Sequence, residues 1–130
     1  MKSTLRLFLQ AGLLATGMAL AASQAAESGY DKTRFEAALA QGKPVIVDFA
    51  ADWCPTCRAQ KPIVEELLKE PRMQGVTLFV ANFDTERALK ARLRIVQQST
   101  FVVFKGGKEV ARSTGQTARQ ALSDLFAQAL

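Results

Sequence analysis

The two cysteines of the chain, Cys54 and Cys57, lie within the stretch Trp53-Cys54-Pro55-Thr56-Cys57. Two thiols at this spacing can close into a small disulfide and open again. An apolar run over 45–49 precedes them and a segment with helical spacing follows, so we expect Cys54 at the start of a helix. Unpaired backbone N–H groups and the helix dipole favour a thiolate there. The pattern therefore predicts thiol–disulfide exchange.

Other uses of a cysteine pair remain open. Zinc usually takes four Cys or His ligands, and a chain with two cysteines and no histidine cannot supply them alone. A structural disulfide across so short a loop would constrain the unfolded chain little. A dimer could instead hold an iron–sulfur cluster through four cysteines, without redox turnover. We expect redox exchange in a monomer, with no cofactor and no metal.

The amino-terminal segment indicates export. Lys2 and Arg6 precede an apolar stretch over 7–22, and Ser23-Gln24-Ala25 fits a cleavage site. We therefore expect a signal peptide over 1–25, cleaved after Ala25 or Ala26, and a periplasmic protein. An uncleaved membrane anchor is the alternative. The periplasm is kept oxidising, so a Cys-x-x-Cys enzyme there needs an oxidising partner or electrons delivered across the membrane.

Length and charge limit the remaining functions. Of 130 residues, 105 remain after the predicted cleavage, which is enough for one domain over 26–130. The net charge of +5 falls to +3 when Lys2 and Arg6 are removed. The basic residues are scattered without aromatic interleaving, so we expect no nucleic-acid partner.

The 26–130 segment alternates helical and extended patterns. Helices are predicted over 32–40, 58–70, 86–93 and 117–129, and strands over 45–49, 76–83, 100–104 and 109–113, with 27–30 as a polar lead. Asp31 suits a helix cap, and Pro62 should kink the second helix. Strands separated by helices pair in parallel by right-handed crossovers, whereas the last two form an antiparallel hairpin. The order predicts an α/β fold with a central mixed four-stranded sheet flanked by helices.

This pattern resembles the thioredoxin superfamily over nearly the whole 26–130 segment. The matching positions include a buried-carboxylate motif, a helix-kinking proline, the end of a central strand, a hairpin and a late glycine: Val47-Asp48-Phe49, Pro62, Asn82-Phe83-Asp84, Phe104 to Gly107, and Gly115. Pro55-Thr56 followed by Arg58 is similar to periplasmic reductases of cytochrome c maturation. Ala51 to Cys54 is similar to the carboxy-terminal domain of the transmembrane thiol reductase that feeds them. The resemblance implies a thioredoxin fold and disulfide reduction.

Three positions depart from the family. Ser99 stands where thioredoxins carry a cis-proline, and a cis bond before a non-proline residue costs about 2.5–4 kcal/mol, so we expect a trans Gln98–Ser99 bond. Val80 replaces a lysine that often partners the buried carboxylate, and Ala50 replaces a tryptophan. The departure at Ser99 predicts a differently shaped substrate groove and weak general reductase activity.

Each candidate residue has an expected role. Cys54, partly exposed at the helix start, attacks a client disulfide, and Cys57 resolves the mixed disulfide. Asp48 accepts the Cys57 proton, directly or through water, because a charge within an apolar run is costly unless it serves a function. Substrate contacts are assigned to Trp53, Pro55, Thr56, Gln98 and Ser99, with core packing as the alternative for Trp53. The expected partners are protein disulfides and a membrane thiol reductase as electron donor, with an oxidase or isomerase as the alternative.

Overall fold

The computed structural model describes residues 24–130, so the predicted signal peptide lies outside the described residues except for its last two positions. The elements are β1 (Ala26–Gly29), α1 (Lys32–Ala40), β2 (Val45–Ala50), α2 (Pro55–Leu68), the short 3-10 helix η1 (Pro71–Met73), β3 (Thr77–Asn82), α3 (Arg87–Leu93), β4 (Thr100–Lys105), β5 (Lys108–Thr114) and α4 (Arg119–Ala127). Within residues 24–130, no helix combines the length and the hydropathy that a membrane crossing needs.

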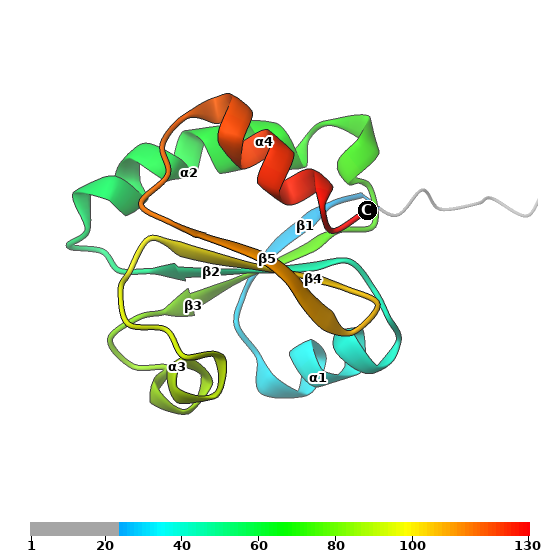
Figure 1. Ribbon diagram of the computed structural model, residues 1–130, viewed down its shortest axis with the longest axis horizontal. Coiled ribbons are helices and arrows are strands. Elements are labelled where there is room, and N and C mark those ends of the chain that lie inside the picture. Colours follow the sequence, from blue (N-terminus) through cyan, green and yellow to red (C-terminus); the bar gives the residue numbers. More distant parts are fainter. Residues whose placement is uncertain (1–23) are drawn as a thin grey trace, which may run out of the picture.

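One mixed sheet runs through the centre of the molecule (Figure 1), with the strand order β1-β3-β2-β4-β5. Strands β1, β3 and β2 are parallel, and β4 and β5 add an antiparallel hairpin next to β2. The α/β architecture and the central position of β2 are as predicted. Strand β2 therefore delivers the chain from the middle of the sheet directly to the two cysteines.

The sheet has five strands, so the predicted count of four was wrong. The missed strand is β1, which pairs in parallel with β3 at the edge of the sheet. Its sequence, Ala-Glu-Ser-Gly, is mostly exposed and has no apolar alternation. It forms because the neighbouring strand offers unpaired backbone groups, an influence that local sequence patterns do not reveal.

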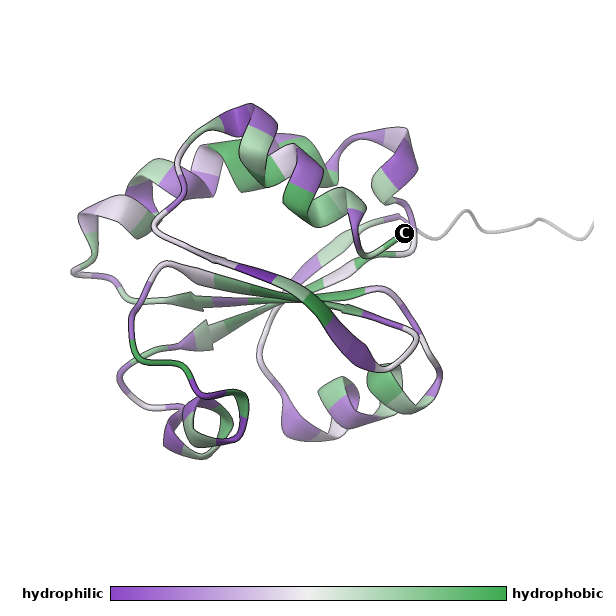
Figure 2. Cartoon of the chain, viewed as in Figure 1, coloured by the Kyte–Doolittle hydropathy of each residue, from purple (hydrophilic) through white to green (hydrophobic). Residues whose placement is uncertain are grey.

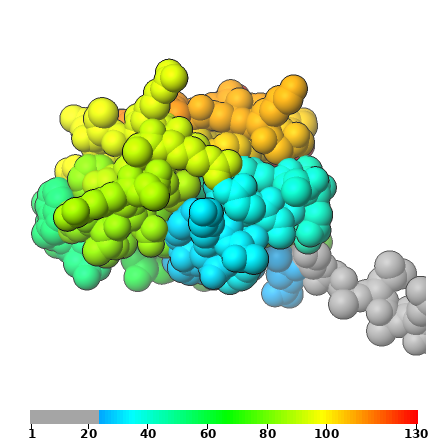
Figure 3. Space-filling model, turned by 90° about the horizontal axis from the view of Figure 1, so that it is seen from below, coloured from blue at the N-terminus to red at the C-terminus, as the bar shows by residue number. Residues whose placement is uncertain are grey.

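Helices cover both faces of the sheet. Helices α2 and α4 pack on one face and α1 and α3 on the other, as Figure 1 shows. Figure 3 views the α1/α3 side, where α1 (cyan) and α3 (yellow-green) lie side by side. The Arg92 guanidinium joins them, because it pairs with Glu36 and lies 5.5 Å from the ring centroid of Phe35.

Strand β2 is buried on both faces, which explains its nearly continuous apolar sequence. Figure 2 shows that β2 and β3 are largely hydrophobic, whereas the outer strand β5 carries hydrophilic segments. Ile46 belongs to the core beneath α2 and α4, and Val47 and Phe49 belong to the core beneath α1 and α3. Since side chains alternate along a strand, Asp48 faces α2 with Ile46.

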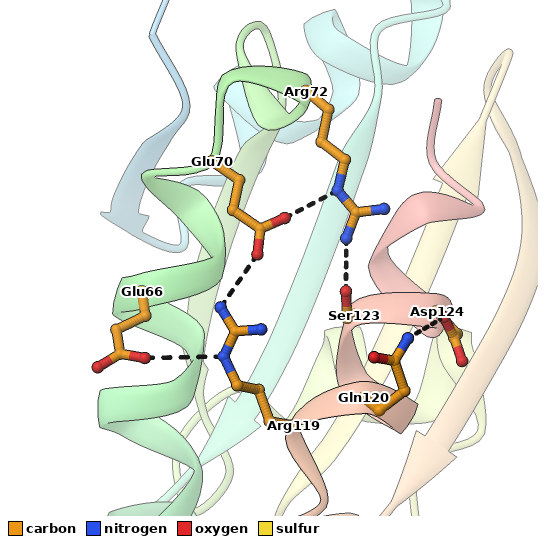
Figure 4. A network of polar contacts seen from close by, with 7 residues as sticks. All are labelled: Glu66, Glu70, Arg72, Arg119, Gln120, Ser123 and Asp124. Atoms are coloured by element: carbon orange, nitrogen blue, oxygen red, sulfur yellow. Dashed lines mark hydrogen bonds and ion pairs between the residues drawn. The ribbon is translucent and has the colours of Figure 1, made fainter.

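Helix α2 continues past Pro62 and ends at Leu68. A polar network then ties its carboxyl end to η1 and α4 (Figure 4). Arg119 on α4 contacts Glu66 at 3.7 Å and Glu70 at 3.1 Å, while Arg72 pairs with Glu70 at 2.8 Å. These contacts hold α2 at its far end, and the apolar core holds its middle.

Candidate active site

The two cysteines form a disulfide at the amino end of α2. Cys54 is the N-cap residue, with extended backbone angles, and Pro55 occupies the first helical turn, where a missing N–H removes no helix hydrogen bond. The two Cα atoms are 5.3 Å apart. The backbone N–H of Cys57 donates to Cys54 Sγ at 3.0 Å. In the reduced protein the same N–H can stabilise a Cys54 thiolate.

The exposure of Cys54 differs from the prediction. We expected a partly exposed attacking thiol, but Cys54 is 0% exposed and Cys57 is 9% exposed in this oxidised form. Ala50, Ala51 and Phe83 pack against the disulfide and cover it. Any molecule that reacts with Cys54 Sγ must therefore displace these neighbours or slide past them.

Asp48 lies on β2 behind the disulfide. Its Oδ1 is buried and has no hydrogen-bond partner among the described residues. Burial, and to a smaller extent the negative charge of Glu27, raise the pKa of the Asp48 carboxyl from 3.8 to about 7. A carboxylate with this pKa can exchange protons with solvent at neutral pH, as a general base needs to do.

A cavity of about 440 Å³, here called the rear cavity, connects Asp48 with Cys57. It runs between α2 and the parallel edge of the sheet. Its lining includes five charged residues, namely Glu27, Asp48, Asp52, Arg58 and Lys61. The structure thus brings the predicted base and the predicted resolving cysteine to one solvent-accessible space.

Trp53 lies on the surface next to the disulfide. It is 55% exposed, and its indole N–H donates to Asp84 Oδ2 at 2.8 Å. Core packing, the alternative for this residue, does not describe such a position. Helix α3 begins shortly after this residue, with Glu86 at its N-cap. The side chain of Asn82 accepts the N–H groups of Asp84 and Thr85.

Ser99 directly precedes β4, the strand that pairs with β2. The described residues contain no cis peptide bond, so the Gln98–Ser99 bond is trans. Ser99 is buried and has a φ of 54°, in the left-handed region. A hydrogen bond from Ser99 Oγ to the Gln98 carbonyl, at 2.6 Å, accompanies this conformation. The loop that leads into β4 therefore contains a serine in the left-handed conformation.

Gln60 was not predicted as a site residue. It is 1% exposed on α2, and its Nε2 donates to the Ser99 carbonyl at 3.4 Å and to the Gln116 carbonyl at 2.9 Å. It thereby joins the active-site helix to the loops that carry Ser99 and Gln116. A signal was present, because Gln60 lies four residues before Val64 on the apolar stripe of the helix, where a polar side chain is unexpected.

The remaining predicted contacts occupy the same end of the molecule. Pro55 is exposed, and Thr56 and Gln98 are half-buried. Glu27 was also missed, because its strand was not predicted. The guanidinium of Arg58 donates to the Asp52 carbonyl at 3.0 Å and fixes the turn before Cys54.

Comparison with known proteins agrees with this geometry. The family model described as Thioredoxin matches residues 28–128. The thioredoxin of Alicyclobacillus acidocaldarius is 33% identical over 96 residues, which cover 74% of this chain and 90% of that protein. The bifunctional thioredoxin reductase/thioredoxin of Mycobacterium leprae is 35% identical over 92 residues, covering 71% of this chain but 20% of that longer protein.

A solved structure gives the same result. The crystal structure of Trxlp from Edwardsiella tarda EIB202 superposes with a TM-score of 0.76 and 40% sequence identity, covering 78% of this chain and 98% of that one. The mixed sheet, the helix capped by Cys54 and the disulfide to Cys57 are the parts on which a thiol–disulfide exchange depends. The chain belongs to the thioredoxin family, and it is a thioredoxin-like disulfide oxidoreductase with its cysteine pair at Cys54 and Cys57.

Proposed function

We propose that this protein is a periplasmic protein-disulfide reductase that receives electrons from a membrane thiol reductase. The observation that carries the proposal is the shared rear cavity, which places a carboxylate able to titrate near pH 7 beside the resolving cysteine. The resolving step needs a base, because the Cys57 thiol must lose its proton before it attacks.

The charges around the pair favour the reducing direction. Three carboxylates (Glu27, Asp48 and Asp52) and two cations (Arg58 and Lys61) line the rear cavity, a net charge of −1 when Asp48 is ionised. A strong oxidant requires a stabilised reduced thiolate. An excess of negative charge behind the cysteines disfavours that thiolate and thus opposes an oxidase.

The amino-terminal pattern supports the location. Lys2, Arg6, the apolar stretch and the small residues around Ala25 have the order of a secretory signal. When the full chain is expressed in a Gram-negative bacterium, we expect a periplasmic protein that begins at Ala26 or Glu27. A cytoplasmic protein with an intact amino terminus would contradict this part of the proposal.

Two measurements test the activity. Equilibration with glutathione should give a reduction potential more negative than about −200 mV, on the side of thioredoxins and glutaredoxins, whereas a value near about −120 mV would indicate an oxidase. In insulin reduction, Cys54→Ala should abolish turnover and Cys57→Ala should accumulate mixed disulfides. If Cys57 proved to be the readily alkylated, low-pKa thiol, the two roles would be reversed.

A further inference from the structure

Near Asp48, the edge of the sheet has unfilled space beside one residue, Gly29. Gly29 on β1 is in register with Val80 on β3, and Val80 is in register with Asp48 on β2. Residues in register point to the same face, so these three positions form one row beneath α2. A Cβ placed on Gly29 would meet no atom within 4 Å. The row therefore ends in open space that belongs to the rear cavity.

The rear cavity is large enough for water. Its 440 Å³ greatly exceeds the roughly 30 Å³ that one water molecule occupies in the liquid. The buried Oδ1 of Asp48 lacks a protein partner among the described residues and can accept a hydrogen bond from such a water. The exposed Glu27 and Lys61 stand at the solvent side of the same space.

Under the proposed function, a client approaches the disulfide from the side opposite the rear cavity. Trp53, which directly precedes Cys54, is exposed, and Gln60 ties the Ser99 loop to the helix that begins there. A bound client protein covers this front side during the resolving step. A proton released at that moment has to leave in another direction.

We propose that the rear cavity is the proton port of the resolving step, through which water enters beside Gly29 and Glu27, reaches Asp48 and Cys57, and carries the proton to bulk solvent. Glu27 is a positioning residue in this proposal, since it acts on Asp48 across the cavity. The inference rests on the proposed function, because it assigns a route to the proton that Asp48 accepts.

The resolving step moves one proton and two electrons. In the mixed disulfide, Cys54 Sγ is bonded to a client sulfur, and the other client sulfur has left and taken a proton from solvent. Cys57 gives its proton to Asp48, its sulfur attacks Cys54 Sγ, and the bond to the client breaks with the electron pair on the client sulfur. The client gains two electrons and the cysteine pair loses two. Asp48 then passes its proton to water in the rear cavity.

The charged groups around Asp48 set the direction of each expected change. Glu27 faces it from β1, Asp52 from the loop after β2, and Arg58 and Lys61 from α2, while β3 contributes only neutral side chains. Removing the charge of Glu27 lowers the pKa of Asp48, because a like charge is lost. Filling the space at Gly29 raises that pKa, because Asp48 loses water.

The test uses the reduced full-length protein and the aromatic disulfide dithiobis(nitrobenzoate) in a stopped-flow instrument. The first equivalent of released thionitrobenzoate reports attack by Cys54, and the second reports resolution by Cys57. Gly29→Leu should move the pH midpoint of the second phase upward by about one unit, so that resolution at neutral pH slows about threefold to tenfold. Gly29→Ala, which removes the glycine but leaves the space open, should behave as wild type, and the first phase should not change.

A second pair of variants does not alter the backbone. Glu27→Gln should move the midpoint of the second phase downward, while Glu65→Gln, the same charge change on α2 outside the rear cavity, should not move it. Opposite shifts from Gly29→Leu and Glu27→Gln would support the port. Unchanged midpoints in both, or equal slowing of both phases by Gly29→Leu, would overturn it.

Asp48→Asn separates the two proposals. If it slows the second phase while Gly29→Leu and Glu27→Gln do not alter that phase, Asp48 remains the base and the port is wrong. If Asp48→Asn leaves the second phase unchanged at all pH values, the base assigned under the proposed function is wrong and the port fails with it. Both proposals predict that Gly29→Leu adds no further slowing in the Asp48→Asn background.

Discussion

On the α1/α3 face of the sheet, Phe35 packs edge-on against Phe79 and Phe104, with ring centroids 5.9 Å and 5.6 Å apart. On the α2/α4 face, the apolar core gives way near the disulfide to Asp48 and Gln60, each with a buried oxygen that has no partner among the described residues. The first face gains the packing energy of a dry aromatic cluster. The second face has less packing energy near the disulfide, because the polar side chains of Asp48 and Gln60 take the place of apolar ones there.

The largest expected effect comes from the aromatic face. Phe35 is 0% exposed, and Phe35→Ala should lower the free energy of unfolding by about 3–5 kcal/mol, because it removes a buried ring and leaves a cavity. Urea denaturation of the oxidised protein measures the loss. Both phases of the reaction with dithiobis(nitrobenzoate) should keep their rates while the variant is folded. A selective change in the second phase would show that the two faces are not independent.

On the α2/α4 face, we expect a substitution to raise the free energy of unfolding instead of lowering it. The pKa of Asp48 is about 7 in the folded protein, against an ordinary value of 3.8. The folded state therefore binds the proton more tightly, and the wild type loses stability relative to Asp48→Asn as the pH rises from about 4 to about 7. Above that range Asp48→Asn should be more stable by on the order of 4 kcal/mol, at about 1.4 kcal/mol per pKa unit.

Denaturation of the oxidised proteins at several pH values checks this. The two proteins should be similar at pH 4, which serves as the internal control. A constant difference at every pH would mean that the amide changes stability for a reason other than the charge of Asp48. Loss of the buried Phe35 ring would then lower the free energy of unfolding, whereas loss of the buried Asp48 charge would raise it.

The sequence alone predicted those elements and residues of the two faces that follow from local patterns. The spacing predicted α1 with the Asp31 cap, whose carboxylate accepts the N–H of Arg34 at 2.7 Å, and the apolar run predicted β2. The resemblance supplied the fold. Asp48 was identified because a single charge interrupts that run.

Other parts depend on contacts between distant segments. Strand β1 forms only because β3 lies beside it, so Glu27 and Gly29 gave no sign that they border the rear cavity. Gln60 binds carbonyl groups 39 and 56 residues away, and only the folded chain brings them together. The burial of Cys54 was missed for the same reason, since Phe83 covers it from another strand's end.

A substitution at Ser99 should change the free energy of unfolding by less than the two substitutions above. The resemblance predicts that Ser99→Pro raises general reductase activity and lowers adventitious metal capture, but the φ of 54° is incompatible with a proline. We therefore expect Ser99→Pro to lower the free energy of unfolding by more than about 1 kcal/mol, because the loop must be rebuilt. Insulin turnover should still rise severalfold.

Ser99→Gly is the matched control for this loop. Glycine tolerates the left-handed conformation and should leave both turnover and stability close to those of the wild type. Turnover and metal content of the three proteins, prepared side by side, decide the matter. Equal turnover and equally negligible metal in Ser99→Pro and wild type would show that the serine does not limit access to the thiols.

The smallest expected effect concerns the hydrogen bond between Trp53 and Asp84, on the surface beside the disulfide. Asp84 holds the exposed indole of Trp53 at 2.8 Å, beside a disulfide that is itself covered. Asp84→Ala frees the ring and increases the conformational entropy lost when a client docks, so KM for insulin should rise about twofold to fivefold with kcat unchanged, which corresponds to roughly 0.5–1 kcal/mol. Trp53→Ala, which removes the ring, should raise KM further than Asp84→Ala does. The small reagent dithiobis(nitrobenzoate) does not need a docking surface, so its two phases should be the same in all three proteins. If Asp84→Ala instead slowed the first phase, the hydrogen bond would act on Cys54 itself, and the recognition surface could not be separated from the chemistry behind it.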